Sequence, residues 1–592
     1  MLQTAVTKRP RDITLSKAAA LLYGDLGTSK AYVIGIAFAA MGYASFWLIV
    51  AVSLLLILVG LNYVIVCKYY PNGGGVYAST RDRSEVVALI GSFFLIVDYL
   101  VTAAISALSA FIYFGVASPI IWSSIAVLLI GVLNSFGPKQ AGRFAVFIGY
   151  ATIAVFVLLT LIALPHLPEG FRNVEPLTGS ILKDWEAFIG VIVALSGIET
   201  IANITGIMKL NRGSTASHPS VTKISTPAIL RVIFQVAILT TIFSLAISSI
   251  HGFTVSNGTV YGAEGGEVRD LMLRYLGETL ATNLFGEAVG QIFGIVLSGV
   301  IGFLLLSAVN TAMVGLSSLQ YVMASDGIIP RFFEKLNRYG VPVVPLIIAT
   351  LVPMVLILVV HDIVHLADLY AIGFVGAIAT NLGSMATNFK LGLRFRERLF
   401  LFISFVIMVC VEISLFTEKP HARAFLVTTM LIGLILRALT REYKEDQEKQ
   451  KEAPSLSIDQ GAIFCATQHE GRALDYAVEK ALRLKKPLHV LFVKEQEVLT
   501  NRDLKRRASQ DAQASELLLA LKKRLPKKLL HFHYSVSDAP AATIAEYATK
   551  LQIPQLIVGL PRDRGLRHML HGNLLRDLVK LLPEEQVLLV IA

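Results

Sequence analysis

Long apolar stretches are the feature that most limits how this chain folds. They recur from Leu15 to about Leu439, and each is roughly 17–25 residues long, enough for a helix to cross a hydrocarbon core about 30 Å thick. Only 16% of the residues are charged, whereas soluble domains contain about a quarter. The sequence therefore predicts a polytopic α-helical membrane protein, followed after Arg441 by a charged, soluble segment.

The number and orientation of the spans follow from the same pattern. We predict about twelve spans, at residues 14–40, 45–69, 86–117, 119–136, 141–164, 185–208, 227–250, 284–324, 342–361, 364–388, 398–416 and 422–440. Alternate loops hold about twenty and about six lysines and arginines, so the richer set, with both termini, is expected in the cytoplasm. We expect a bacterial plasma (inner) membrane protein whose surroundings are the lipid bilayer. Because the net charge of +11 lies largely in these short loops, no nucleic-acid partner is expected.

The first and sixth spans contain breaks in the middle of the membrane. The first reads Tyr-Gly-Asp-Leu-Gly-Thr-Ser over residues 23–29, and the sixth reads Leu-Ser-Gly-Ile-Glu-Thr over residues 195–200. Interrupted helices at corresponding positions of two five-helix halves are typical of inverted-repeat transporters, whose freed backbone groups form a site near the bilayer midplane. The alternative is that the glycines only allow close helix packing, but packing does not require the two acids.

The carboxylates that lie most clearly at membrane depth are Asp25, Asp98 and Glu199. Each costs roughly 2.5–3.5 kcal/mol on insertion scales, so each indicates a function or a partner. Asp98, Thr102 and Ser106 recur at every fourth position, which places a carboxylate and two hydroxyls on one helix face that suits a hard cation. A structural acid at a hydroxyl-bonded helix interface is the alternative. Glu199 and Asp98 are the candidates for proton coupling, because a buried carboxylate binds a proton more readily when no cation is near.

At these residues the chain resembles the amino acid–polyamine–organocation superfamily, and within it the KUP and KimA-like potassium importers. The first break, with Tyr32 seven residues after Asp25, resembles the KUP first-helix signature. Residues 71–77 (Pro-Asn-Gly-Gly-Gly-Val-Tyr), residues 196–199 (Ser-Gly-Ile-Glu) and residues 369–373 (Leu-Tyr-Ala-Ile-Gly) resemble further segments of KimA-like proteins.

The resemblance implies a LeuT-like fold, which is a five-plus-five inverted repeat with two further helices, over residues 1–440. It implies secondary active import of K⁺, coupled to H⁺ by symport. The ion-binding residues that it implies are Asp25, Tyr32, Asp98, Thr102, Ser106, Ser196, Glu199 and Tyr370. Two alternatives remain: a proton-coupled amino acid permease of the same superfamily, and a membrane sensor that binds a ligand without transporting it. We expect no enzyme, because no catalytic or metal-ligand constellation is found, and no resident cofactor.

Lys30 departs from the KUP pattern, which usually has proline at this position. A lysine close to a cation site repels the cation, and a low dielectric strengthens that repulsion. Snorkelling toward the outer boundary is the interpretation we favour. The others are that the lysine faces away, that it pairs with an acid such as Asp25, or that the substrate is not a bare cation.

The C-terminal part reads as a linker at residues 441–457 and a cytoplasmic domain at residues 458–592. Short apolar runs alternate with helical patterns, which predicts a parallel, doubly wound α/β sheet. Residues 472–477 and 556–559 resemble universal stress protein domains, which implies a regulatory or homodimerisation role.

Nucleotide-binding members of that family cradle phosphates with a glycine motif. Gly559 and Gly572 hold its outer positions here, whereas Arg562 and Asn573 replace a glycine and a hydroxyl residue. Residues 466–467 are Ala-Thr where an aspartate is expected, which argues against the usual ATP-binding mode. A regulatory nucleotide, cyclic di-AMP or ATP, is the weaker hypothesis beside an assembly domain with solvated arginines.

Overall fold

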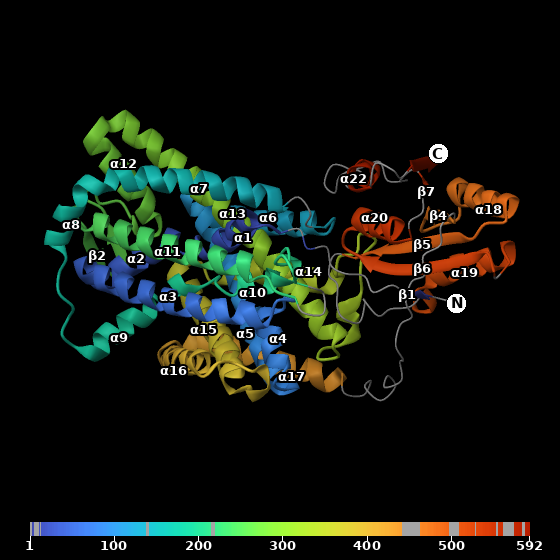
Figure 1. The fold of residues 1–592 in the computed structure, drawn as a ribbon. Coiled ribbons are helices and arrows are strands. Elements are labelled where there is room, and N and C mark those ends of the chain that lie inside the picture. The colour runs from blue at the N-terminus through green and yellow to red at the C-terminus, as the bar shows by residue number, and fades with distance from the viewer. Residues whose placement is uncertain are drawn as a thin grey trace.

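The computed structural model consists of a helical body and an α/β domain, which lie at opposite ends of the molecule in Figure 1. It describes residues 3–4, 11, 13–137, 141–214, 219–440, 462–496, 508–526, 528–551, 555–559, 574–582 and 587–591. The predicted linker at residues 441–457 lies outside these residues. Both labelled ends of the chain lie at the α/β end of the molecule.

The helical body is built from long apolar helices joined by short ones. The long helices are α1 (Leu15–Leu26), α2 (Lys30–Met41), α3 (Ser45–Tyr69), α5 (Glu85–Tyr113), α6 (Pro119–Asn134), α7 (Ala141–Ala163), α9 (Ile181–Gly190), α11 (Thr222–Ile247), α12 (Met272–Phe285), α13 (Glu287–Ser325), α14 (Val343–Val359), α15 (Ile363–Thr387), α16 (Phe395–Glu418) and α17 (Pro420–Thr440). The short helices that matter below are α4 (Gly75–Arg81), η3 (Ile192–Leu195), α10 (Thr200–Ile204) and η5 (Arg269–Leu271).

Every predicted span corresponds to a helix or a broken pair of helices. Among the described residues, eight helical stretches are long and apolar enough to cross a membrane, or nine when the bent pair at residues 181–207 counts as one span. The stretch Leu15–Tyr69 covers the first two predicted spans. The fourth and ninth correspond to the shorter apolar helices α6 and α14, of 16 and 17 residues, so the count of twelve remains a prediction.

The α/β domain contains the predicted parallel sheet. Its strands are β1 (Gln3–Thr4), β4 (Ile463–Ala466), β5 (Leu488–Glu495), β6 (Leu530–Ser537), β7 (Gln555–Gly559) and β8 (Val587–Ile591), in the order β1-β6-β5-β4-β7-β8. The helices α18 (Arg472–Leu484) and α19 (Ala512–Arg524) pack on one face, and α20 (Pro540–Lys550) and α22 (Leu574–Leu581) pack on the other. The sheet is therefore doubly wound. Its edge strand β1 comes from the N-terminus, which the sequence did not predict.

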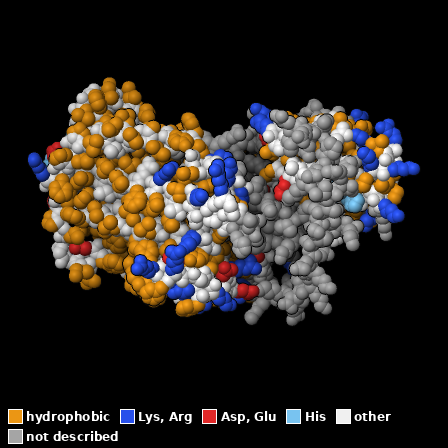
Figure 2. Space-filling model, in the orientation of Figure 1, with side chains coloured by type: hydrophobic (Ala, Val, Ile, Leu, Met, Phe, Trp, Pro, Cys, Tyr) orange, Lys and Arg blue, Asp and Glu red, His pale blue; other side chains and the backbone are white. Residues whose placement is uncertain are grey.

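The surface agrees with this division. Hydrophobic side chains cover most of the helical body on the face that Figure 2 shows, and lysines and arginines gather on the α/β domain and on the part of the body nearest to it. Exposed large apolar residues lie along the outer faces of the long helices, for example Leu54, Leu129, Ile295 and Ile435. An apolar belt of this kind is the surface that a bilayer solvates.

Candidate functional site

The break in the first span lies between α1 and α2. Helix α1 ends at Leu26, and the Thr28 hydroxyl donates to the Asp25 carbonyl at 2.6 Å, while the Ser29 hydroxyl donates to the Leu26 carbonyl at 3.0 Å. Hydroxyls that return to nearby carbonyls satisfy backbone groups that a broken helix would leave unpaired in the membrane. The sequence motif thus makes the break and stabilises it.

The break in the sixth span lies between η3 and α10. A separate bend of 49° lies upstream of this break, where α9 meets the stretch from Ile192 to Ile207. Ser196 is extended, and Gly197 has φ +92°, a conformation that glycine adopts without strain. Glu199 is the residue before α10, at the N-terminus of the continuing segment.

The two breaks touch each other. The Thr200 hydroxyl donates to the Asp25 carboxylate at 2.5 Å. A Cβ atom on Gly197 would lie 2.7 Å from the Leu26 nitrogen and 2.9 Å from the Asp25 Cγ. The backbone of one break therefore fits directly against the carboxylate of the other.

Helix α5 supplies the third carboxylate. Asp98 interacts electrostatically with Glu199 and Asp25, so the three acids form one cluster. On the same helix face, the Thr102 hydroxyl donates to the Asp98 carbonyl at 2.7 Å, and Ser106 follows one turn later. A Cβ atom on Gly373 would lie 2.7 Å from the Asp98 nitrogen, which shows how closely α15 packs behind the acid.

Two predicted tyrosines also reach the cluster. Tyr32 on α2 interacts with Asp25 and Asp98, and with the side chain of Ser196. Tyr370 on α15 interacts with Asp98, Asp25 and Glu199. The structure thus brings the predicted residues of the first, third, sixth and tenth spans to one region.

This region is buried and has free acceptor oxygens. Each of the eight predicted residues is at most 4% exposed. Oxygen atoms without a hydrogen-bond partner belong to Asp25, Asp98, Ser106, Ser196 and Glu199. No three His, Cys, Asp or Glu side chains within the described ranges converge closely enough to hold a metal ion by themselves. A cation bound here would therefore need hydroxyl or backbone oxygens in addition to the acids.

Four polar residues of this region were missed from the sequence. Tyr63 on α3 and Tyr99 on α5 both interact with Glu199, and the amide of Asn203 donates to the Tyr99 hydroxyl at 2.7 Å. Thr200, which holds Asp25, is the fourth. The signal available in the sequence was the presence of polar residues inside apolar spans, which is the same signal that identified the acids.

Lys30 is where the sequence interpretation was wrong. We expected snorkelling, but the side chain is 0% exposed and lies in the interior of the helical body. Its side-chain nitrogen lies 4.9 Å from the Tyr23 ring centroid and 5.4 Å from that of Phe156, and it has no hydrogen-bond partner. The alternative of a pair with Asp25 is also wrong, because the Lys30 nitrogen makes no hydrogen bond and no electrostatic interaction with Asp25.

Contacts on both sides of the site close it. On the side of the α/β domain, Asp326 after α13 accepts from the Tyr77 hydroxyl at 2.5 Å and pairs with Arg81 of α4. On the opposite side, Arg269 of η5 pairs with Asp362 at 2.6 Å, and its backbone carbonyl packs against Gly35 of α2. The structure is thus an occluded arrangement.

The candidate nucleotide site lies almost entirely outside the described residues. Arg562, Gly572 and Asn573 belong to that undescribed part, and Gly559 is the last residue of β7. Thr467, after β4, uses its hydroxyl to donate to the His469 carbonyl at 2.7 Å.

Comparison with known proteins adds independent findings. Residues 13–436 match the family described as amino acid permease, and residues 465–590 match the universal stress protein family. Over 386 residues the chain is 26% identical to a Bacillus subtilis (strain 168) protein described as "Potassium transporter KimA". That match covers 61% of this chain and 59% of the relative, so the chain spans about three fifths of the relative's length.

Proposed function

Since the match over residues 13–436 shows that this chain belongs to the amino acid permease family, we propose that it is a secondary transporter that imports K⁺ together with H⁺. The observation that carries this proposal is the cluster of Asp25, Asp98 and Glu199 at two touching helix breaks, with unpartnered oxygens around it.

The cluster favours a cation over an amino acid carboxylate. Three buried acids near one another make the region electronegative, and the interior dielectric strengthens attraction for a positive charge. Carboxylate and hydroxyl oxygens are the ligands that hard cations prefer. The similarity to a relative described as a potassium transporter supports the same choice.

The crowding of the acids suggests how protons take part. Like charges at short range in a buried site cannot all remain ionised, so at least one acid carries a proton when no cation is bound. In symport that acid keeps its proton while K⁺ binds the ionised carboxylates, and both ions are released on the inner side. The proposed proton carriers are Glu199, which directly precedes α10, and Asp98 of α5, which interacts with it.

Uptake in a potassium-auxotrophic bacterial host tests the substrate. We expect growth at low external K⁺ and a loss of uptake on addition of a proton uncoupler. The family match makes an amino acid permease the second candidate. Failure to restore growth, together with proton-coupled amino acid uptake, would favour that second candidate.

Glu199→Gln tests proton coupling. Because the amide keeps the shape but cannot carry a proton or a charge, we expect coupled K⁺ uptake to be abolished, as measured with and without the uncoupler. Glu186→Gln, an exposed residue of α9 in the same span, is the matched control and should behave as wild type. Unaltered coupled flux in Glu199→Gln would remove its proposed role.

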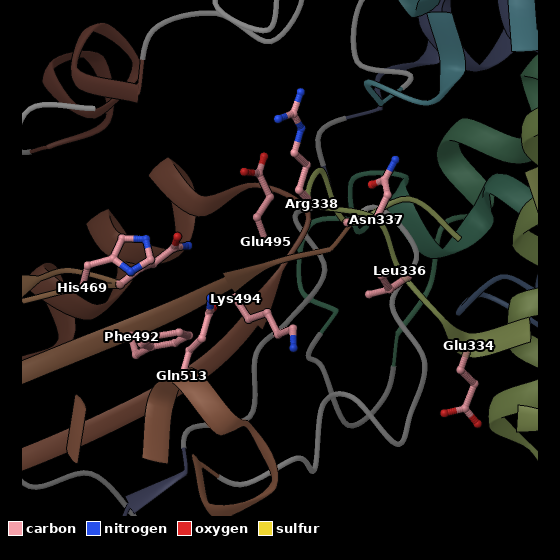
Figure 3. A pocket seen from close by; sticks show the side chains of 11 residues that line it. Glu334, Leu336, Asn337, Arg338, His469, Phe492, Lys494, Glu495 and Gln513 are labelled. Carbon is pink, nitrogen blue, oxygen red and sulfur yellow. The ribbon is translucent and has the colours of Figure 1, made fainter. Parts of the chain in front are cut away.

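The α/β domain is proposed to regulate the transporter through its contact with α13. The buried Gln496, which follows β5, donates to the Tyr321 hydroxyl near the end of α13 at 2.6 Å. Five residues later, Asp326 holds Tyr77 and Arg81. Beside this contact is a cleft of about 620 Å³, lined by Asn337 and Arg338 of the helical body and by Lys494, Glu495 and His469 of the α/β domain (Figure 3).

Gln496→Ala tests this regulation. A hydrogen bond contributes about 1 kcal/mol, so its loss should release the end of α13 and change the K⁺ uptake rate up to about fivefold. We expect faster uptake, because the closing contacts of Asp326 would open more readily. Gln513→Ala, which lines the same cleft without this hydrogen bond to Tyr321, is the control. Equal rates in both variants would contradict the proposal.

Three further proposals concern the oligomeric state, a regulatory ligand and the membrane orientation. We propose a homodimer formed through the α/β domain, to be tested by the mass of the purified protein in detergent. A regulatory nucleotide, cyclic di-AMP or ATP, would be detected by direct binding to the same sample. The loops rich in lysine and arginine support a bacterial inner-membrane protein with cytoplasmic termini, which reporter fusions at each end would test.

A further inference from the structure

Lys30 is a buried amine without an anion. It is the first residue of α2, directly after the break, where the helix dipole makes the environment positive. Its nitrogen has no hydrogen-bond partner, and the faces of Tyr23 and Phe156 lie on two sides of it. Aromatic faces attract an ammonium group, but far more weakly than a carboxylate at contact would.

The groups around Lys30 leave its charge uncompensated. Tyr23 on α1 is the titratable side chain that faces the amine, and Phe156 is the side chain that α7 presents to it. Asp25, Asp98 and Glu199 interact with one another, but none of them interacts with Lys30. The part of the chain that the structure describes offers no other electrostatic partner for this amine. A protonated Lys30 is therefore poorly tolerated in this closed arrangement.

The position of Lys30 connects this charge to movement. Tyr23 belongs to α1 and Lys30 to α2, so the amine lies across the joint between the two halves of the first span. Any separation of α1 from α2 moves the Tyr23 ring away from the amine and admits water. Water solvates an ammonium group, whereas the closed aromatic pocket does not.

We propose that Lys30 is a proton-carrying residue of the transport cycle, which is neutral whenever the empty transporter closes and protonated when the joint between α1 and α2 is open to water. The nitrogen lone pair accepts a proton from water on the outer side, and the ammonium returns that proton to water on the inner side. The empty transporter then closes only after the proton has left. This inference rests on the proposed proton coupling and places a second carrier outside the carboxylate cluster.

Two substitutions of similar size separate this role from a structural one. Lys30→Met is permanently neutral and flexible enough to fill the same pocket. It should close freely and take up K⁺ with fewer protons per ion. Lys30→Arg remains protonated, and the cost of an unpaired charge in the membrane should reduce net uptake at least about tenfold. A lysine that only fills the pocket predicts the same order of uptake but an unchanged number of protons per K⁺ ion, so the proton count decides between the two roles.

The measurement uses the purified full-length protein in liposomes, with K⁺ flux and internal pH recorded together. Lys17→Met, an exposed lysine on α1, is the control, and Lys30→Gln is a second neutral variant in case Lys30→Met does not fold. A wild-type proton-to-K⁺ ratio in the neutral variants, or an active Lys30→Arg, would overturn the inference. If wild type moved protons with an amino acid instead of K⁺, the proposed function would fail, and the same comparison made with that substrate would still decide the role of Lys30.

Discussion

Asp98→Asn should lower the affinity for K⁺ by at least about 30-fold, because removing one partner of a buried charge pair costs about 2–5 kcal/mol. Asparagine keeps the shape of the side chain but not its charge. Both carboxylate oxygens of Asp98 lack a partner in this structure, so they are available to an ion. The measurement is the concentration dependence of K⁺ uptake in the auxotrophic host, corrected for the amount of protein in the membrane.

Protein stability separates loss of binding from loss of folding in Asp98→Asn. Asp98 repels Glu199 and Asp25, so removing its charge should not lower the unfolding temperature of the purified protein. Glu412→Gln is the matched control, since Glu412 on α16 also has buried, unpartnered carboxylate oxygens but lies outside the cluster. Wild-type K⁺ affinity in Asp98→Asn would show that this acid does not bind the ion.

Gly197→Ala should also abolish most transport, through the backbone rather than through charge. The positive φ of +92° costs an alanine about 1–2 kcal/mol. Its Cβ would be 2.7 Å from the Leu26 nitrogen and 2.9 Å from the Asp25 Cγ, and overpacking costs about 1–3 kcal/mol more. The two breaks would have to separate, which would move the Asp25 carboxylate away from Thr200.

Gly190→Ala is the control for this substitution. Gly190 is the last residue of α9 in the same span, and a Cβ atom there would meet no atom within 4 Å. We expect wild-type K⁺ uptake and an unchanged unfolding temperature for Gly190→Ala, and losses of both for Gly197→Ala. Transport at the wild-type rate in Gly197→Ala would mean that close contact between the two breaks is not needed.

Much of the fold follows from local patterns. Apolar stretches long enough to cross a bilayer predict the helices, because the bilayer requires every backbone group to bond within its own segment. Strand and helix patterns likewise predict the doubly wound sheet. The strand β1 was not predictable, because Gln3–Thr4 has no strand pattern of its own and pairs with β6, more than 500 residues away in the chain.

The candidate site divides in the same way. The acids Asp25, Asp98 and Glu199 stand out in the sequence because a carboxylate within an apolar span is costly. Their grouping was expected from a resemblance to known transporters, since spacing along one helix reports nothing about which helices meet. The bond from Thr200 to Asp25 and the fit of Gly197 against it depend on how two distant breaks pack.

The sequence by itself determined that this chain spans a membrane, where its helices break and which acids lie at that depth, because each of these properties is set within a single segment. Only the tertiary structure decided what surrounds those residues. Lys30 shows the difference: its position beside the break is plain from the sequence, which favoured snorkelling to the boundary. The structure instead places its amine between Tyr23 and Phe156, because the packing of α1, α2 and α7 closes the route to water.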